Sequence, residues 1–406
     1  MESRYLTSSI EQIAFGAGKM AFVSGPRQSG KTTLARLLLA SRPKGRYANW
    51  DDIETRRLWV KDPKLLAPVA PGSRPLLVLD EIHKARLWKR SVKGLWDVLG
   101  ANLDVLVTGS ARLNVYRKGS DSLMGRYFHF RLHPFTLREI LHTVPLTPDE
   151  AMNGILTRSQ DAALHERKAF QALLRFGGFP EPFLAASDKR AKLWRRNRID
   201  QVIREDLRDL SRLPELSSIE MLSALLPERV GSLLSVASLQ RDLEVAHNTV
   251  SRWLGWLREL YYIFELKPWQ RRITRSLRKE GKAYLFDWGE VPEPGARFEN
   301  LIACHLLKAV DWWTDTGEGD FALYYARDKE KREIDFVIVK DRKPWLAVES
   351  KLSDTVPSPA WKTFLPQLGC KIGLQIIATP GHWTWHNMGA SRVLVASADE
   401  VLAHLV

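Results

Sequence analysis

The chain has 406 residues, of which 45% are apolar, and it carries a formal charge of +14. This length suffices for about two to three domains, and so apolar a composition excludes a disordered chain. Two cysteines, Cys304 and Cys370, are too few for a disulfide framework, and no apolar run approaches the roughly eighteen residues that span a bilayer. We therefore expect a cytoplasmic protein without a membrane partner. The positive charge favours nucleic acid as a partner. Frequent use of arginine throughout the genome would explain the same charge equally well.

A phosphate-binding P-loop is predicted in the stretch GPRQSGKTT, residues 25–33. The apolar run before it and the helical pattern LARLLLA after it give the strand, loop and helix context that this motif requires. We expect Gly25 and Gly30 to adopt backbone conformations closed to other residues, Lys31 to reach the β- and γ-phosphates of ATP, and Thr32 to ligate Mg²⁺. The residues expected to contact the nucleotide are Gly25, Pro26, Arg27, Gln28, Ser29, Gly30, Lys31, Thr32 and Thr33.

Two acids end the apolar segment PLLVLDEIHK, residues 75–84, as in a buried parallel strand that carries a metal-binding acid and a catalytic acid. We expect Asp80 to complete the Mg²⁺ shell and Glu81 to polarise the attacking water. The next apolar strand, DVLVTGSARL, places Thr108 and Ser110 where one of them would touch the γ-phosphate. The sequence does not decide between them, and Ser110 is included in the expected site.

Arg126 follows a glycine and precedes an alternating strand, Tyr127 to Leu132. It is the candidate for an arginine that stabilises developing charge at its own ATP site or at that of a neighbouring copy. A structural ion pair is the alternative for Arg126.

The segments GPRQSGKTTLA, LLVLDEIHK, LVTGSARL, GRYFHFRLHPFTLREI and FGGFPEPF together resemble those of bacterial and archaeal ATPases that join an AAA-type domain to a C-terminal domain of unknown function 4143. The resemblance covers nearly the whole chain and implies an α/β protein with a P-loop NTPase core of the AAA+ superfamily built on a parallel sheet. It also implies a helical and winged-helix middle and a C-terminal α/β part similar to restriction-endonuclease-like domains. The expected bounds are 1–143 for the ATPase domain, 144–230 for a helical lid or linker, 231–280 for the winged helix and 281–406 for the nuclease-like domain.

Two stretches of the middle region are basic. A long helical pattern carries Lys192, Arg195 and Arg196 on one side. This basic side either contacts a phosphate backbone or is simply exposed to solvent. Residues 232–269 then read as a helix-turn-helix in which Ser235 caps the first helix and a wing-like strand follows the second. In a major groove the second helix would present Asn248, Thr249 and Arg252 to DNA, flanked by His247 and Trp256. A lid or a contact with a partner protein is the alternative, and the following arginines 271, 272, 275 and 278 add charge without sequence specificity.

The last region has a helix, three strands, a helix and a strand in the order of a PD-(D/E)xK nuclease core. Asp335 and the triplet Glu349-Ser350-Lys351 fall on neighbouring predicted strands, and Glu299 lies on the preceding helix. Two carboxylates would bind Mg²⁺ there, with Glu299 as a further ligand, while Lys351 activates water for phosphodiester attack. The alternative is a relic fold in which the acids pair internally with Lys351. The residue before Asp335 is not proline, so the sequence departs from the nuclease pattern there and does not decide whether this site cleaves DNA.

The sequence thus predicts a Mg²⁺-dependent ATP hydrolase that couples its nucleotide state to DNA binding, and to phosphodiester cleavage if the C-terminal site is active. A regulatory ATPase switch with an inactive nuclease-like docking domain is the alternative. A small-molecule kinase is disfavoured because Glu81 beside Asp80 suits water as the acceptor. A partner protein or assembly with further copies is compatible with such a core.

Overall fold

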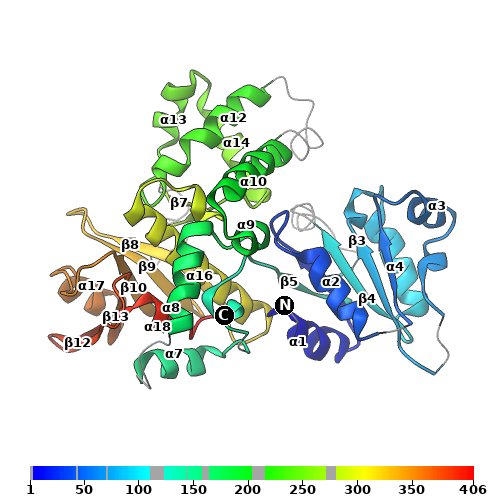
Figure 1. Ribbon diagram of the computed structural model, residues 1–406, viewed down its shortest axis with the longest axis horizontal. Coiled ribbons are helices and arrows are strands. Elements are labelled where there is room, and N and C mark those ends of the chain that lie inside the picture. Colours follow the sequence, from blue (N-terminus) through cyan, green and yellow to red (C-terminus); the bar gives the residue numbers. More distant parts are fainter. Residues whose placement is uncertain are drawn as a thin grey trace. The chain divides into compact units, whose positions relative to one another are not determined.

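The computed structural model describes residues 3–42, 44–69, 72–109, 123–142, 144–157, 164–203, 215–270 and 280–406, apart from the side chain of Leu164. The chain divides into two compact units, Met1–Pro134 and Phe135–Val406 (Figure 1). Ser110 and the arginines 271, 272, 275 and 278 lie outside the described residues, so their expected roles stay predictions.

The first unit is built on a five-stranded parallel sheet with the strand order β2-β3-β4-β1-β5. Its apolar runs make central strands whose side chains are buried on both faces, as a sheet covered by helices requires. Because all strands are parallel, the P-loop after β1 and the acids at the end of β3 lie at the same edge, with β4 between the two strands. The strands are β1 (Met20–Ser24), β2 (Arg46–Asn49), β3 (Leu76–Asp80), β4 (Asp104–Gly109) and β5 (Tyr127–Arg131).

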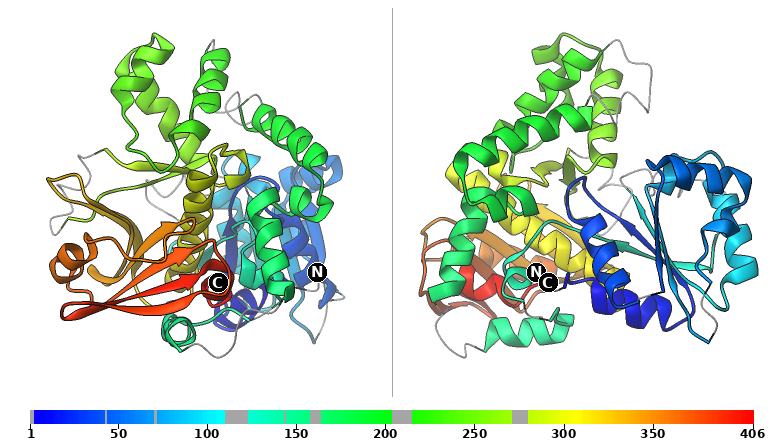
Figure 2. Two further views of the ribbon diagram at one scale, coloured as in Figure 1. Left: turned by 60° about the vertical axis from the view of Figure 1, so that its left-hand side comes forward. Right: turned by 45° about the vertical axis from the view of Figure 1, so that its right-hand side comes forward.

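Helices cover both faces of this sheet. Figures 1 and 2 show α2 on one side, and α3 and α4 on the other. Asp52 caps α3 by accepting a hydrogen bond from the Thr55 amide, which fixes where that helix begins. The helical segments are α1 (Thr7–Ser9), η1 (Ile10–Phe15), α2 (Lys31–Ala40), α3 (Ile53–Lys61), η2 (Pro63–Leu66), η3 (Ile82–Lys84) and α4 (Trp88–Leu99).

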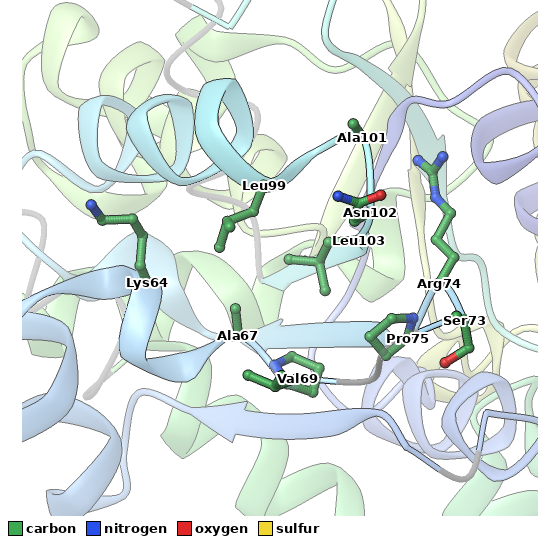
Figure 3. A pocket seen from close by; sticks show the side chains of 12 residues that line it. Lys64, Ala67, Val69, Ser73, Arg74, Pro75, Leu99, Ala101, Asn102 and Leu103 are labelled. Carbon is green, nitrogen blue, oxygen red and sulfur yellow. The ribbon is translucent and has the colours of Figure 1, made fainter.

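A hollow of about 730 Å³ lies at the amino ends of β3 and β4 (Figure 3). Pro75 and Leu103, which directly precede those strands, contribute to its lining together with Val69 and Leu99. The P-loop and the acids lie at the opposite, carboxyl edge of the sheet, where ligands of open α/β sheets bind. The hollow therefore lies at the other end of the strands from the predicted nucleotide site.

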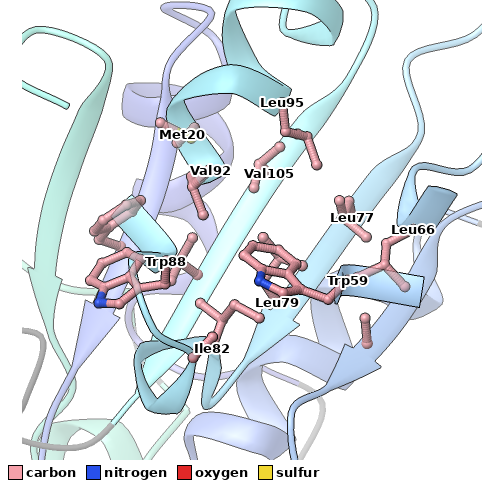
Figure 4. Packing of buried hydrophobic residues seen from close by; sticks show 14 of the residues in the cluster. Met20, Trp59, Leu66, Leu77, Leu79, Ile82, Trp88, Val92, Leu95 and Val105 are labelled. Carbon is pink, nitrogen blue, oxygen red and sulfur yellow. The ribbon is translucent and has the colours of Figure 1, made fainter. Parts of the chain in front are cut away.

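One apolar layer holds α3 and α4 against the sheet (Figure 4). Trp59 of α3 and Trp88 of α4 pack on alternate residues of the strands, among them Leu77 and Leu79 of β3, and all of these side chains are at most 5% exposed. Alternate residues of β3 point to opposite faces, so the layer on one face fixes the strand register. That register also fixes the position of Asp80, the last residue of β3, at the carboxyl edge of the sheet.

The second unit begins with helices and a winged-helix arrangement. Ser235 caps α13 by accepting a hydrogen bond from the Ser238 amide, and β6 and β7 form an antiparallel hairpin after α14. Val250, Leu254 and Leu257 of α14 are buried at helical spacing, so one face of this helix packs inward. The elements are α6 (Leu137–Ile140), α7 (Pro148–Leu156), α8 (Leu164–Phe176), α9 (Pro180–Ala185), α10 (Asp188–Asp200), α12 (Leu216–Leu225), η5 (Pro227–Arg229), α13 (Val236–Leu243), α14 (His247–Glu259), β6 (Ile263–Leu266) and β7 (Lys282–Leu285).

A six-stranded mixed sheet with the order β12-β13-β11-β10-β9-β8 completes the second unit. Helix α16 packs against β8 and β10, and α17 packs on the opposite face through Trp361, Phe364 and Leu365. The order of helix, three strands, helix and strand expected in this region is confirmed. The elements are η6 (Trp288–Glu290), α16 (Pro294–Asp315), β8 (Phe321–Arg327), β9 (Glu333–Lys340), β10 (Lys343–Lys351), α17 (Trp361–Leu368), β11 (Ile372–Ile377), β12 (Trp383–Met388), β13 (Ser391–Ser397) and α18 (Ala398–Leu402).

Candidate functional site

The loop between β1 and α2 has the backbone of an anion-binding turn. Gly30 has φ 95° and Gln28 has φ 61°, so two residues of the loop are in the left-handed region. Gly25 is not, and the expectation of an unusual backbone conformation there is corrected. A Cβ at Gly25 would lie 2.2 Å from the carbonyl oxygen of Leu132, so position 25 requires glycine because another part of the chain passes close to it.

Lys31 points back into this loop. Its ammonium donates hydrogen bonds to the carbonyl oxygens of Gly25 at 3.0 Å and Pro26 at 2.6 Å, and the residue is 7% exposed. Ser29 Oγ is buried and has no hydrogen-bond partner among the described residues. A buried ammonium and an unsatisfied hydroxyl within one loop fit a polyphosphate, which accepts hydrogen bonds from both.

Arg4 braces the loop from the N-terminal segment, a role that the sequence did not reveal. Its guanidinium donates to the carbonyl oxygen of Ser29 at 2.6 Å and to that of His133 at 3.0 Å, and the residue is 3% exposed. The contacts join residues far apart in the chain and go to backbone oxygens. No local pattern around Arg4 signals them.

Three hydroxyl groups converge on the carboxylate of Asp80 at the end of β3. Thr32 Oγ1 donates to Oδ2 at 3.1 Å and Tyr47 Oη donates to the same oxygen at 2.5 Å, while Thr108 donates to Oδ1. The expected metal ligands Thr32 and Asp80 are therefore in direct contact. Hydroxyl and carboxylate oxygens are the ligand types that Mg²⁺ uses beside a bound polyphosphate, so this donor set fits that ion. Tyr47 was missed because its strand, β2, carries no motif.

Glu81 follows Asp80 and has φ 57°, a left-handed conformation that costs about 1–2 kcal/mol for a residue with a side chain. Its amide donates to the carbonyl oxygen of Thr108, and its carboxylate lies 3.7 Å from Lys84 Nζ. Burial raises the pKa of Glu81, and the charges of Lys31 and Lys84 oppose that shift. A half-buried carboxylate on a strained backbone, beside the residues expected to bind Mg²⁺, is placed as a catalytic base would be.

Thr108 is expected to stabilise the first unit through its hydrogen bond to Asp80. Thr108→Val keeps the shape of the side chain but removes one donor from a buried carboxylate, which should lower the free energy of unfolding by about 1.5–3 kcal/mol. Urea denaturation monitored by tryptophan fluorescence measures this loss. Thr108→Ser keeps the hydroxyl and is the matched control, and an equal loss in both variants would contradict the role of the hydrogen bond.

Arg126 lies away from this site. It precedes β5, whose first residue Tyr127 is paired with Met20 at the start of β1, so Arg126 is at the amino edge of the sheet. Its guanidinium pairs with Asp97 at 2.7 Å. The structure thus has the ion pair that was the alternative, and a role of Arg126 within its own ATP site does not fit this geometry. A role at the site of a neighbouring copy stays a prediction.

The helix-turn-helix residues expected to contact DNA differ in their solvent exposure and in their contacts with other side chains. His247 and Asn248 are exposed and Thr249 is half-buried at the start of α14. Arg252 is exposed, forms an ion pair with Glu215 at 3.4 Å and stacks on Trp256 at 5.2 Å. DNA contact by Asn248, Thr249 and Arg252 stays a prediction.

The basic side expected on α10 is only partly exposed. Lys192 and Arg196 are exposed, but Arg195 turns inward and pairs with Asp287 at 2.8 Å. Arg195 also donates to the carbonyl oxygen of Phe176. It therefore holds residues 176–180, here called the FGGFP corner, and does not extend toward a phosphate backbone.

The C-terminal acids lie together, but an ammonium lies among them. Lys282 Nζ is 3.2 Å from Glu299 and 3.6 Å from Asp335, while Lys351 Nζ is 3.0 Å from Glu349. Within the described part of the chain, no group of three or more His, Cys, Asp or Glu side chains is arranged to hold a metal ion. In this arrangement the residues do not fit a bound Mg²⁺, and their role in cleavage stays a prediction.

Comparison with known families accounts for most of the chain. Residues 17–141 match the family model of the AAA domain, and residues 294–382 match that of domain of unknown function 4143. The chain joins an AAA-type ATPase domain to this C-terminal domain. The expected order of an AAA-type domain followed by domain of unknown function 4143 is thereby confirmed, and the nuclease-like character of the C-terminal part stays a prediction. Residues 167–291 between the two match domain of unknown function 8612. The fold class of an ATPase parallel sheet followed by a separate α/β sheet domain is confirmed as well.

Similar proteins include uncharacterized proteins of Mycobacterium tuberculosis and Mycobacterium bovis, each 25% identical over 406 residues that cover 94% of this chain and 81% of the relative. Among solved structures, the Aeropyrum pernix ORC1 protein in complex with DNA is 14% identical, with a TM-score of 0.33 and coverage of 74% of this chain and 92% of that one. The AMPPCP-bound DnaA of Aquifex aeolicus is 12% identical, with a TM-score of 0.32 and coverage of 63% and 86%. No described helix of this chain is both long enough and apolar enough to traverse a membrane.

Proposed function

We propose that the AAA-type domain is a Mg²⁺-dependent ATP hydrolase. The observation that carries this proposal is the contact between Thr32 and Asp80, which joins the P-loop to the acid-bearing strand with Glu81 next in the chain. Both Mg²⁺ ligands and a water-activating carboxylate therefore belong to one edge of the sheet.

Each residue has a defined task in this proposal. Lys31 turns from the loop carbonyl oxygens to the β- and γ-phosphates, where its charge stabilises the transferring group. Thr32 and Asp80 would hold Mg²⁺, which neutralises charge on the phosphate oxygens when bound. Glu81 orients the attacking water and accepts its proton. Tyr47 and Thr108 fix the Asp80 carboxylate through their hydrogen bonds.

The pH dependence of ATP turnover tests the role of Glu81. A base works only when ionised, and the pKa of Glu81 is raised, so activity should fall as the pH drops through a value above the ordinary glutamate range of about 4.3. We expect kcat/KM to show this acid limb in assays of phosphate release with saturating Mg²⁺, and EDTA to abolish turnover. Glu81→Gln should lower turnover by about 10²–10⁴. Retention of both the acid limb and the rate in Glu81→Gln would assign the base to another residue.

We propose that the nucleotide state is coupled to DNA through the winged helix, on the evidence of the exposed start of α14. Asn248→Ala is expected to weaken binding of duplex DNA, measured by fluorescence anisotropy, by about 1–3 kcal/mol if Asn248 reads a base edge. Glu244→Ala removes an exposed side chain from the turn before α14 and is the control. Equal affinity of the parent and Asn248→Ala for DNA would contradict contact through this face.

A regulatory switch with an inactive nuclease-like domain is the second candidate, because Lys282 lies among the acids of that domain. It predicts ATP turnover without strand cleavage. Incubation with Mg²⁺ or Mn²⁺ and linear, branched or single-stranded DNA separates the two candidates. Cleavage that is lost in Asp335→Ala would support an active nuclease and oppose the switch.

A further inference from the structure

The acidic cluster of the second unit surrounds one buried lysine. Lys282 Nζ lies 2.5 Å from Glu333, 3.2 Å from Glu299 and 3.6 Å from Asp335, and its side chain is 3% exposed. These carboxylates come from α16 and β9, whereas Lys282 is the first residue of β7, in the hairpin that follows the helix-turn-helix. In Figure 1, β7 lies next to α16. The ammonium thus joins the winged-helix hairpin to the C-terminal sheet.

Oxygen atoms of Glu299 and Asp335 have other partners as well, whereas Oε2 of the neighbouring Glu349 has no hydrogen-bond partner among the described residues. Tyr284 donates to Glu299 Oε1 at 2.8 Å, and Asp335 Oδ2 accepts hydrogen bonds from the amide and hydroxyl of Ser350 at 2.9 and 3.0 Å. Glu349 is paired with Lys351 at 3.0 Å. A divalent cation needs about six oxygen ligands, and here it would have to displace an ammonium that repels it at close range.

Buried carboxylates are costly unless a positive charge lies close to them. Burial by itself lowers the pKa of Lys282, but Glu299, Asp335 and Glu333 outweigh burial and raise it above the usual lysine range. The lysine is therefore charged throughout the physiological pH range. It provides the cluster with the positive charge that a metal ion provides in a metalloenzyme.

We infer that this cluster is an internal-cation site, in which the ammonium of Lys282 takes the place of a divalent metal ion and fastens the β6–β7 hairpin to the C-terminal sheet. The domain accordingly binds a segment of its own chain at its acids instead of a metal. The inference does not depend on ATP hydrolysis, because none of its residues belongs to the P-loop unit.

Removing the lysine tests this inference directly. The full chain carries Asp80→Asn throughout, so that the proposed nucleotide site holds no Mn²⁺. In this background Lys282→Met is expected to lower Tm in EDTA by on the order of 10 °C, because carboxylates are left without their counter-charge. MnCl₂ should restore much of the loss, since the Met side chain leaves room for a cation among three acids. The parent chain should show no Mn²⁺-dependent change in Tm.

Lys308→Met is the matched control, because Lys308 is also fully buried and pairs with a carboxylate, Glu139, at 2.5 Å. It should be destabilised without recovering in Mn²⁺. Adding Asp335→Asn to Lys282→Met should abolish the recovery. If Lys282→Met is as stable as its parent, or is destabilised but indifferent to Mn²⁺, the inference is overturned. If that variant gives no folded protein, electron paramagnetic resonance of the parent with Mn²⁺ decides: an ion bound there and lost in Asp335→Asn overturns the inference, and no such ion supports it.

Discussion

Lys31→Ala is expected to weaken ATP binding strongly and to abolish turnover by the full-length protein. The buried ammonium of Lys31 lies within the loop that would surround the phosphates, and each charge-assisted hydrogen bond that it makes to them is worth about 1.5–3 kcal/mol. Losing two such bonds should weaken ATP affinity by at least about 100-fold. Isothermal titration with a non-hydrolysable ATP analogue and Mg²⁺ measures the loss.

Lys61→Ala is the control for this substitution, because it removes the same charge from an exposed position at the end of α3. It should bind the nucleotide as the parent does. Equal affinities in Lys31→Ala and the parent would mean that the nucleotide binds elsewhere.

Gly178→Ala is expected to destabilise the second unit strongly. A Cβ at this position would lie 2.4 Å from the ring of Trp288 and 2.6 Å from the carbonyl oxygen of Phe135. Trp288 is fixed by its own hydrogen bond to Leu173 at 2.7 Å, so neither neighbour can give way cheaply. We expect a loss of about 3 kcal/mol in the free energy of unfolding, measured by urea denaturation.

Gly255→Ala makes the same chemical change where nothing lies within 4 Å of the new Cβ. It sits inside α14 and should stabilise the protein by about 0.5–1 kcal/mol, because alanine favours helix over glycine. If the two variants were equally stable, close packing at the FGGFP corner would not be the cause.

Local patterns were enough to predict many of the elements and to indicate which residues meet at the candidate nucleotide site. The P-loop and Asp80-Glu81 each follow a continuous apolar run, and such runs form parallel strands whose ends meet at one edge. The burial of Val250 and Leu254 likewise followed from helical spacing. These predictions depend on neighbours within a few residues, which a single sequence displays.

The residues that were missed act across long separations. Arg4 reaches the P-loop, and Lys282 reaches acids on α16 and β9, through contacts that only the folded chain creates. Tyr47 contacts Asp80 because β2 pairs with β3, a pairing that no turn or motif indicates. Lys351 was expected to activate water, with internal pairing to the acids as the alternative, whereas Lys282 makes most of the contacts with these acids.

The nucleotide recovered from Glu81→Gln after incubation with Mg²⁺ and ATP tests the central claim most directly. The variant keeps Lys31, Thr32 and Asp80, so it should bind ATP as the parent does and retain it unhydrolysed. The parent in the same conditions should release phosphate and yield ADP. Chromatography of the protein-bound nucleotide separates the two results: ATP in the variant and ADP in the parent is the predicted outcome, and ADP formed at the parental rate in Glu81→Gln would contradict hydrolysis through Glu81.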